Sequence, residues 1–286
     1  MLPELPEVEN VRRSLEALVV GKTIEEVEVR LGRIIRTPDD AVQFAAVLAG
    51  HSIKGIGRRG KYLLLDIPPY TLVSHLRMEG QYRLSNQGEE EALHTHVVFR
   101  FTDGTELRYR DVRQFGTMDL VMSEEEYPQG LKSLGPEPFD PALTADALYK
   151  CLHKRRAPIK AVLLHQSCLA GLGNIYVDEA LFLARIHPER QASDITKKQS
   201  KLLLVAIRDV LQRAIDAGGS SIKTYVNGYG RHGGFQMELN VYAREGQPCR
   251  ECQTVIEKLR IAGRGTHVCP QCQRRPKSRR KKQIAN

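Results

Sequence analysis

Apolar side chains near the start of the chain follow the period of an amphipathic helix. They recur at steps of three and four residues, at Val8, Val11, Leu15, Leu18 and Val19. Pro6 suits the first turn of such a helix because its missing N–H has no helical partner there, and Gly21 suits the helix end. The pattern predicts a helix that begins close to Pro3 and Glu4. These two residues then have two interpretations: a plain helix start, or chemical groups held near the positive end of the helix.

Residues 23–121 contain short runs that predict strands, and the first of them alternates apolar with charged residues. The runs are 27–31, 62–67, 71–76, 96–101, 106–109 and 118–121, and Gly, Pro, Asn and Asp separate them. Many short strands at nearly regular spacing are typical of an antiparallel sandwich or barrel. We therefore expect residues 1–125 to form an N-terminal antiparallel β-sandwich with the opening helix on its flank. The fold class would be α+β, with more than one domain.

The pattern changes beyond residue 123. Residues 126–140 are rich in Glu, Pro and Gly and predict a linker. A helical period follows, and its last long helix has an apolar face made of Leu202, Leu203, Val205, Ala206, Val210, Leu211, Ala214 and Ile215. The glycine-rich residues 220–237 predict a mobile loop, and a long loop inside a compact domain is usually either functional or disordered. We expect a helical second domain over residues 141–235.

Size and charge narrow the class of protein. A chain of 286 residues can hold two or three domains, and it has neither an apolar run long enough to span a membrane nor a basic-then-apolar leader. We therefore expect a cytoplasmic protein. Much of the net charge of +9 comes from seven Lys and Arg residues in the expected disordered tail, residues 274–286. That tail fits either a solvated arm or a nonspecific nucleic-acid contact.

Two residues of the expected sandwich have both a structural and a chemical interpretation. Lys61 follows Arg58-Arg59-Gly60 at the start of a strand, so it fits a solvated turn, a phosphate contact or a proton-transfer site. Met78 lies at a strand end and by itself fits core packing.

Two further pairs of residues in the sandwich carry weaker signals. His94 and His96 have the look of a metal pair, but no further ligand stands nearby, which favours a polar surface contact. Arg113 and Phe115, two positions apart in a loop, can point the same way, as side chains that read nucleic acid would.

The helical part carries a local positive stripe and a glycine-rich turn. The stripe consists of Lys150, Lys154, Arg155, Arg156 and Lys160, with no acid among residues 150–160. Residues 170–176, Ala-Gly-Leu-Gly-Asn-Ile-Tyr, lead into a helix predicted at 177–183. Glycines at a helix N-terminus form a ready phosphate site. The spacing differs from the dinucleotide motif Gly-x-Gly-x-x-Gly, so we expect no nucleotide cofactor.

Four cysteines show the spacing of a structural zinc site. Cys249 and Cys252 form one Cys-x-x-Cys pair, and Cys269 and Cys272 form another after sixteen intervening residues. Four thiolates close a tetrahedral site, so we expect one structural Zn²⁺ that supplies folding energy to residues 238–273. Paired disulfides are the alternative, which a reducing cytoplasm disfavours.

The remaining features of this part are an arginine and two cysteines. Gly263-Arg264-Gly265 predicts a hairpin tip that displays Arg264. Cys151 and Cys168 are expected to stay unpaired, as small buried apolar side chains.

In their order and spacing, these motifs resemble the bacterial formamidopyrimidine-DNA glycosylases along nearly the whole chain. The matching stretches are Pro-Glu-Leu-Pro-Glu-Val-Glu at 3–9, Lys61, His94, Asp-x-Arg-x-Phe-Gly at 111–116, Gly-x-Gly-Asn-Ile-Tyr at 171–176, and the four-cysteine finger with Arg264. The resemblance implies a bifunctional glycosylase and lyase that removes 8-oxoguanine and ring-opened purines. It also implies a β-sandwich, a helix–two-turn–helix DNA-binding domain and a zinc finger whose hairpin enters the minor groove.

The resemblance implies a catalytic role for four residues. Pro3, as a free N-terminal secondary amine, would attack C1′ of the damaged nucleotide, and an α-amine is more often neutral near pH 7 than a lysine side chain. Glu4 would be the general acid that helps to open the sugar. Lys61 and Arg264 match positions of phosphate contact and proton donation during β- and δ-elimination.

It also implies how the protein would hold DNA. Asn174, His94, Arg113 and Arg155 match DNA-contacting positions, and we add Lys160 from the positive stripe. Met78, Arg113 and Phe115 match the trio that fills the gap left by a flipped base. The loop 220–237 corresponds to the segment that closes over the extruded lesion. The expected partner is double-stranded DNA with oxidised purines or abasic sites, bound by a monomer at the bacterial nucleoid.

Leu2 departs from the family pattern Met-Pro-Glu. A leucine in second place blocks methionine removal and leaves Pro3 in an amide, which is not a nucleophile. We expect translation to start one codon later, at a leucine codon read as an initiator, so that Pro3 becomes free. Two alternatives stay open: an endonuclease VIII type enzyme for oxidised pyrimidines, and a lesion-binding protein without catalysis.

Overall fold

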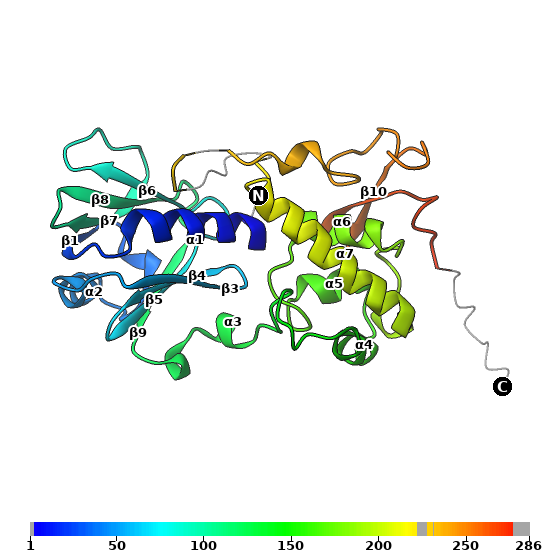
Figure 1. Ribbon diagram of the computed structural model, residues 1–286, viewed down its shortest axis with the longest axis horizontal. Coiled ribbons are helices and arrows are strands. Elements are labelled where there is room, and N and C mark those ends of the chain that lie inside the picture. The colour runs from blue at the N-terminus through cyan, green and yellow to red at the C-terminus, as the bar shows by residue number, and fades with distance from the viewer. Residues whose placement is uncertain (1–2, 222–227, 231, 277–286) are drawn as a thin grey trace.

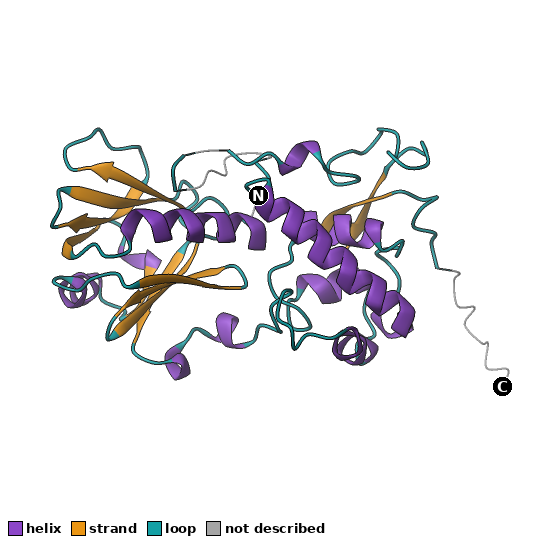
Figure 2. Cartoon of the chain, viewed as in Figure 1, coloured by secondary structure: helices purple, strands orange, loops and turns teal. Residues whose placement is uncertain are grey.

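The computed structural model describes residues 3–221, 228–230 and 232–276, and it consists of a β-rich part beside a helical part (Figures 1 and 2). Helix α1 (Leu5–Val19) runs along the β-rich part and begins close to the end of α7 (Lys197–Asp216). The side chain of Asn10 on α1 donates a hydrogen bond to the carbonyl of Ile215 on α7. The first helix therefore contacts both halves of the protein.

The sequence pattern predicted α1 closely. Pro6 lies in its first turn, and the apolar face packs into the sandwich core through Val8, Val11 and Leu15. The helix ends at Val19, and Gly21 then adopts a φ of 88°.

Two sheets form the sandwich. One has the order β1-β7-β8-β6 and the other β2-β9-β5-β4-β3. Their bounds are β1 Ile24–Val29, β2 Ile35–Thr37, β3 Gly55–Arg59, β4 Tyr62–Ile67, β5 Tyr70–His75, β6 Gln81–Asn86, β7 Thr95–Phe101, β8 Thr105–Arg110 and β9 Thr117–Val121. The pairing is antiparallel except between β2 and β9, which run parallel. The expectation of a sandwich is confirmed, with this one exception to its antiparallel pairing.

Several elements of the sandwich have no counterpart in the predicted strand runs. They are β2, β3, β6 and helix α2 (Ala41–Leu48). The start of α2 has a local signal, because the Asp40 side chain accepts hydrogen bonds from the backbone N–H groups of Val42 and Gln43. Phe44 and Leu48 bury the inner face of this helix.

The helical part contains α4 (Ala145–His153), α5 (Ile159–Leu164), α6 (Asn174–Leu183) and α7 around one apolar core. Two side chains assigned to the inner face of α7, Leu202 and Val205, are instead 48% and 60% exposed. The core-facing stripe passes through Leu203, Ala206 and Val210, so those two positions lie beyond its width. Among the described residues, no helix is both long and apolar enough to cross a membrane.

Short helices occupy several of the connections. They are η1 Gly32–Ile34, η2 Glu124–Glu126, α3 Gln129–Lys132, η3 Ala192–Asp194 and η4 Phe235–Met237. The segment predicted as a linker therefore contains α3, and Leu131 in this helix is buried.

The C-terminal part is a hairpin of β10 (Glu257–Ile261) and β11 (Arg264–Val268) that contacts α6. Ala262 and Gly263 turn between the strands with positive φ. Arg264 follows the turn with its side chain exposed, as the sequence predicted.

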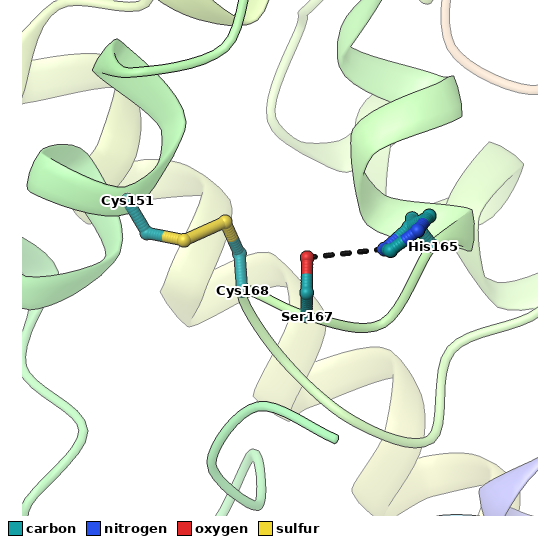
Figure 3. Close-up of a disulfide and its surroundings, with 4 residues drawn as sticks. All are labelled: Cys151, His165, Ser167 and Cys168. Carbon is teal, nitrogen blue, oxygen red and sulfur yellow. Dashed lines mark hydrogen bonds between the residues drawn. A yellow bond between two sulfur atoms is a disulfide. The ribbon is translucent and has the colours of Figure 1, made fainter. Parts of the chain in front are cut away.

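The expectation that Cys151 and Cys168 stay unpaired is wrong. Cys151 on α4 and Cys168 in the segment between α5 and α6 form a disulfide, with their Cα atoms 5.7 Å apart (Figure 3). Packing of α4 against the segment before α6 brings together residues that lie 17 positions apart in sequence. That packing is a tertiary contact, which cysteine spacing alone does not reveal.

Candidate active site

The carboxylate of Glu4 lies at the N-terminus of α6. It accepts hydrogen bonds from the backbone N–H groups of Gly173 (2.7 Å), Ile175 (2.9 Å) and Tyr176 (3.3 Å). The N-terminus of a helix carries unpaired N–H groups and a partial positive charge, so it favours a carboxylate. The side chain is 2% exposed. The second residue of the Pro3-Glu4 pair thus reaches across to the helical domain.

This contact changes the interpretation of the glycine-rich turn. The sequence suggested a phosphate site at residues 170–173, but the anion at this helix N-terminus is the Glu4 carboxylate. A Cβ at Gly173 would lie 2.4 Å from Cδ of Glu4, and one at Gly171 would lie 2.4 Å from Cδ1 of Leu5. The two glycines are therefore required because the start of the chain packs directly on their backbone.

Glu7 forms a second buried carboxylate beside Glu4, and sequence reasoning did not single it out. It accepts hydrogen bonds from the backbone N–H of Glu4 (2.8 Å), the hydroxyl of Tyr176 (2.5 Å) and the backbone N–H of Ser220 (2.8 Å). Burial raises the pKa of Glu7 to about 7, with a further contribution from the nearby Glu4 charge. Burial also raises the pKa of Glu4. Glu4 is therefore more readily protonated than an exposed glutamate, as a general acid requires.

Lys61 lies in the two-residue turn between β3 and β4 and is 8% exposed. Burial lowers the pKa of its ammonium group, while the charges of Glu4 and Glu7 oppose that shift. Its neighbour Gly60 has a φ of 56°, and a Cβ there would lie 2.7 Å from Cδ1 of Leu134. The turn that carries Lys61 is thus fitted closely against the segment that connects the two domains.

Glu137, in the segment read as a linker, holds this turn. Its carboxylate accepts hydrogen bonds from the backbone N–H of Gly60 (2.6 Å) and from the guanidinium groups of Arg58 (2.8 Å) and Arg59 (3.1 Å). Arg58 also pairs with Glu9 of α1 at 3.0 Å. The basic cluster before Lys61 is therefore engaged within the protein. Sequence reasoning missed Glu137, although its place in Gly-Pro-Glu-Pro was visible.

A cavity of about 600 Å³ joins these groups to the C-terminal hairpin. Five of its lining residues were singled out from the sequence: Glu4, Lys61, Met78, Asn174 and Arg264. Its other lining residues include Tyr242, Glu245, Lys258 and His267, which were not. The cavity thus combines a buried carboxylate, a lysine and an arginine from three distant parts of the chain.

Buried polar contacts fix the hairpin to the helical domain. The carbonyl of Gly265 accepts hydrogen bonds from the side chains of Asn174 and Lys160, both at 3.0 Å. Lys160 forms an ion pair of 2.7 Å with Asp178 on α6, and both side chains are fully buried. The backbone N–H of His267 donates to the same Asp178. These contacts hold the strand that begins with Arg264.

The position of Lys160 corrects part of the expected positive stripe. Its side chain is enclosed between α6 and β11, so it is not placed as a surface contact for DNA. Burial lowers the pKa of Lys160, while the ion pair with Asp178 acts against that shift. Arg155, another member of the stripe, is half-buried.

The structure brings the expected intercalating residues to neighbouring turns. Met78 lies in the turn that ends at Gly80, and Arg113 and Phe115 lie in the loop that ends at Gly116. A Cβ at Gly80 would lie 2.4 Å from the hydroxyl oxygen of Tyr109, and a Cβ at Gly116 would lie 1.7 Å from the same atom. Both turns therefore pack against one tyrosine.

Two side chains of this trio are available at the surface. Phe115 is 52% exposed, and the Arg113 guanidinium lies 5.0 Å from the centre of its ring. His94 is also exposed, with a φ of 68°, whereas His96 is buried and hydrogen-bonded to the carbonyl of Asp111. His96 is therefore not the surface contact that its sequence suggested.

Of the expected lesion loop, residues 220–237, the described part of the chain includes 220–221, 228–230 and 232–237. Residues 222–227 and 231 lie outside it. On one side, Ser220 binds Glu7; on the other, the backbone N–H of Gly228 donates to the Ser14 hydroxyl at 2.9 Å. Both anchors are on α1, the helix that starts beside Glu4.

The four expected zinc ligands meet beside the hairpin. The sulfur atoms of Cys249, Cys252, Cys269 and Cys272 all lie within 4.8 Å of one another. Four Zn–S bonds of about 2.3 Å in tetrahedral geometry place sulfurs about 3.8 Å apart. Three of the sulfur pairs lie at 3.4, 3.5 and 4.0 Å, and none of these cysteines is in a disulfide. The donor set fits one structural zinc ion.

Comparisons with known proteins agree with this geometry. Residues 2–118 match the formamidopyrimidine-DNA glycosylase N-terminal domain, residues 134–226 match the H2TH domain of the same enzymes, and residues 246–275 match the zinc finger found in FPG and IleRS. The chain is 55% identical to a formamidopyrimidine-DNA glycosylase of Halalkalibacterium halodurans and 54% identical to one of Bacillus cereus. In both comparisons the match covers 96% of this chain and the whole relative.

Solved structures give the same result. A mutant of the Lactococcus lactis FPG, in complex with DNA containing Fapy-dG, superposes with a TM-score of 0.90 at 44% identity. A MutM complex with DNA containing carbocyclic 8-oxo-G superposes with a TM-score of 0.89 at 44% identity. Each match covers 96% of this chain and all of the other. The chain belongs to the formamidopyrimidine-DNA glycosylase family.

Proposed function

We propose that this protein removes oxidised purines, 8-oxoguanine and formamidopyrimidines, from double-stranded DNA and then cleaves the strand at the abasic site. The observation that carries the proposal is the buried Glu4 carboxylate, held at the N-terminus of α6 directly after Pro3 and lining a cavity with Lys61 and Arg264. Relatives of the same family are solved with DNA containing Fapy-dG, an 8-oxo-G analogue or an abasic site.

Pro3 is the proposed nucleophile. A secondary amine that attacks C1′ forms an iminium ion, which is permanently cationic and acidifies the C2′ proton, so strand cleavage by elimination follows. Pro3 lies next to Glu4 and is buried. The reaction requires a free proline nitrogen, and therefore an N-terminus from which Met1 and Leu2 are absent.

Glu4 is the proposed general acid. Its raised pKa favours the protonated form that can assist opening of the sugar ring, and the helix N-terminus stabilises the carboxylate that remains. The lowered pKa of Lys61 increases the fraction of neutral amine available for proton transfer in the elimination steps. Arg264, exposed at the start of β11, is the proposed contact for a phosphate of the lesion strand.

For DNA binding, we propose that Met78, Arg113 and Phe115 fill the gap left by the flipped nucleotide. The exposed ring of Phe115 beside the Arg113 guanidinium supports this assignment. His94, Asn174 and Arg155 are the proposed backbone contacts. We further propose that the protein acts as a monomer on chromosomal DNA of a bacterium.

Borohydride trapping with a duplex that carries 8-oxoguanine opposite cytosine tests the proposal. We expect a covalent protein–DNA complex whose cross-link maps to Pro3, and Pro3→Gly should strongly reduce both trapping and nicking. Binding of abasic DNA without nicking would instead indicate a lesion-binding protein. Faster cleavage of thymine glycol duplexes than of 8-oxoguanine duplexes would favour an endonuclease VIII type enzyme.

Intact-mass measurement of the native protein completes the test. We expect a chain that begins at Pro3. A native chain that retains Met1 and Leu2 and still traps DNA would exclude Pro3 as the nucleophile.

A further inference from the structure

Two cysteines outside the zinc site form a covalent link near the glycine-rich turn. Cys151 is half-buried on α4, and Cys168 is 2% exposed in the segment that leads into α6 (Figure 3). The chain has six cysteines, and the other four form the zinc cluster. These two sulfurs are therefore a separate pair with its own chemistry.

The segment that contains Cys168 is hydrogen-bonded to the start of the chain. The carbonyl of Gly171 accepts a hydrogen bond of 3.0 Å from the backbone N–H of Leu5. Two residues later, Gly173 donates to Glu4. Cys168 lies three residues before the first of these contacts, so a restraint on it acts close to the Glu4 carboxylate.

The same segment also holds the connection between the two domains. The backbone N–H of Gly135 donates to the carbonyl of Gln166 at 2.9 Å, and the N–H of Ala170 donates to the carbonyl of Pro136 at 2.9 Å. A Cβ at Gly135 would lie 2.6 Å from the carbonyl oxygen of Ser167. Segment 165–173 is thus a junction between the sandwich, the connection and α6, and the disulfide fastens this junction to α4.

We propose that Cys151 and Cys168 are a redox modification site, a dithiol that hydroperoxides convert into the disulfide and thiol reductants restore. Cys151, the more exposed of the two residues, is the proposed site of attack by the peroxide, and the buried Cys168 is the proposed resolving thiol. Oxidation stabilises the helical domain and the Glu4-binding turn. The biological role of this site rests on the proposed function, because hydrogen peroxide is also the source of the hydroxyl radicals, formed with reduced metal ions, that oxidise purines in DNA.

The chemical steps balance with a hydroperoxide as the oxidant. The Cys151 thiolate attacks the distal oxygen of the peroxide, the O–O bond breaks, and water or an alcohol leaves while a sulfenic acid forms. The Cys168 sulfur then attacks the sulfenic sulfur, the S–O bond breaks, and water leaves with the thiol proton. Two thiols have lost two electrons and two protons, and the peroxide has gained them.

The expected stabilisation comes from chain entropy. A cross-link between residues 17 positions apart restricts the unfolded chain, and for a loop of this length in a helical domain of this size the effect corresponds to a rise in Tm of roughly 10–20 °C. The rise should appear in the transition of the helical domain and should disappear on reduction.

The test uses the full-length, zinc-loaded protein, reduced with dithiothreitol, desalted and treated with hydrogen peroxide. The thiols are followed by maleimide tagging after denaturation and by peptide mapping. A colorimetric assay follows the bound zinc. We expect the loss of two tags, a peptide joined through Cys151 and Cys168, zinc retained in full, and a Tm higher by roughly 10–20 °C. Dithiothreitol should reverse all of these changes.

Two variants serve as controls. Cys151→Ser and Cys168→Val should each show no peroxide-dependent cross-link at this site and no rise in Tm, and having both ensures a result if one fails to fold. The proposal is overturned if the pair keeps its thiols under peroxide, if the zinc cysteines oxidise first with release of zinc, or if the cross-link forms without a rise in Tm.

These readouts do not depend on glycosylase activity. Borohydride trapping on 8-oxoguanine DNA, measured on the same samples after incubation at a temperature near the lower Tm, should decay at least about twofold more slowly for the oxidised protein. If the cross-link and Tm shift occur but no trapping is seen at any temperature, the proposed function fails while the redox site stands.

Discussion

The Glu4 carboxylate accepts a hydrogen bond from the backbone N–H of Gly173 at 2.7 Å, across 169 positions of sequence. This contact places the side chain that follows Pro3 at the positive end of α6 and closes the β-rich and helical parts around one cavity. The start of the chain is therefore positioned by the second domain, and not by the sandwich alone.

Gly173→Ala should displace Glu4. The new Cβ would lie 2.4 Å from Cδ and 2.5 Å from Oε1 of Glu4, so the carboxylate has to leave the helix N-terminus. We expect a loss of roughly 100-fold in the rate of borohydride trapping, and a lower Tm. Gly32→Ala is the matched control, because its Cβ would make only an ordinary contact of 3.8 Å with Ala41. Equal activity of the two variants would contradict the role given to this turn.

The stability of the protein should fall as pH rises from about 5 to 8, in part through Glu7. Its pKa is about 7 in the folded state, against an ordinary value of 4.5, so the folded state binds the extra proton between these values. Loss of that proton therefore lowers the free energy of unfolding, by at most about 3 kcal/mol for this group. Urea unfolding of the wild type and of Glu7→Gln measures this effect. The free energy of unfolding of the variant should depend less steeply on pH. An unchanged slope would show that Glu7 titrates normally.

Glu137→Gln should disturb the turn that carries Lys61 without touching DNA directly. The carboxylate binds the Gly60 N–H and two arginines, and an amide cannot accept all of these hydrogen bonds. We expect the ratio of the β-elimination product to the β,δ-elimination product to rise roughly tenfold. The Kd for abasic-site DNA should stay within about twofold of the wild-type value. Glu124→Gln, an exposed glutamate of the same connection, is the control. A uniform loss of all activities would instead indicate general destabilisation.

Asp178→Ala should be severely destabilising. It leaves the ammonium group of Lys160 buried without its partner, a change that typically costs about 3–5 kcal/mol. It also frees the His267 N–H and loosens the strand that begins with Arg264. Glu251→Ala, which removes an exposed ion pair with Arg185, should leave Tm nearly unchanged. Chemical denaturation of both variants measures the difference.

Removal of zinc should unfold the C-terminal hairpin and leave the sandwich folded. The cluster around the four cysteines has only a small apolar core, formed by Phe182, Val241 and Ile256 with Cys249 and Cys269. We expect treatment with a chelator, or Cys269→Ser, to abolish DNA binding while most of the far-UV circular dichroism remains. Retention of binding after loss of zinc would show that the hairpin holds its position through the Asp178 contacts alone.

Local patterns predicted the elements whose signals are contained within a few residues. Helix α1 and strand β4 follow from apolar periodicity, and the four-cysteine cluster follows from ligand spacing. The hairpin tip at Arg264 follows from its flanking glycines. Helix α2 was missed because a short helix inside a series of strands has few turns over which its period can be seen.

The amino-acid sequence was sufficient to list the parts of this protein: a helix start with Pro3 and Glu4, a β-sandwich, a helical part, a zinc finger, and a match to one family of DNA glycosylases. Which groups meet became clear only from the packing of those parts. That packing placed Glu4 rather than a phosphate on α6, enclosed Lys160 against Asp178, and joined Cys151 to Cys168. Burial, pKa and pairing depend on neighbours brought from distant parts of the chain, whereas periodicity and spacing report only on residues close in sequence.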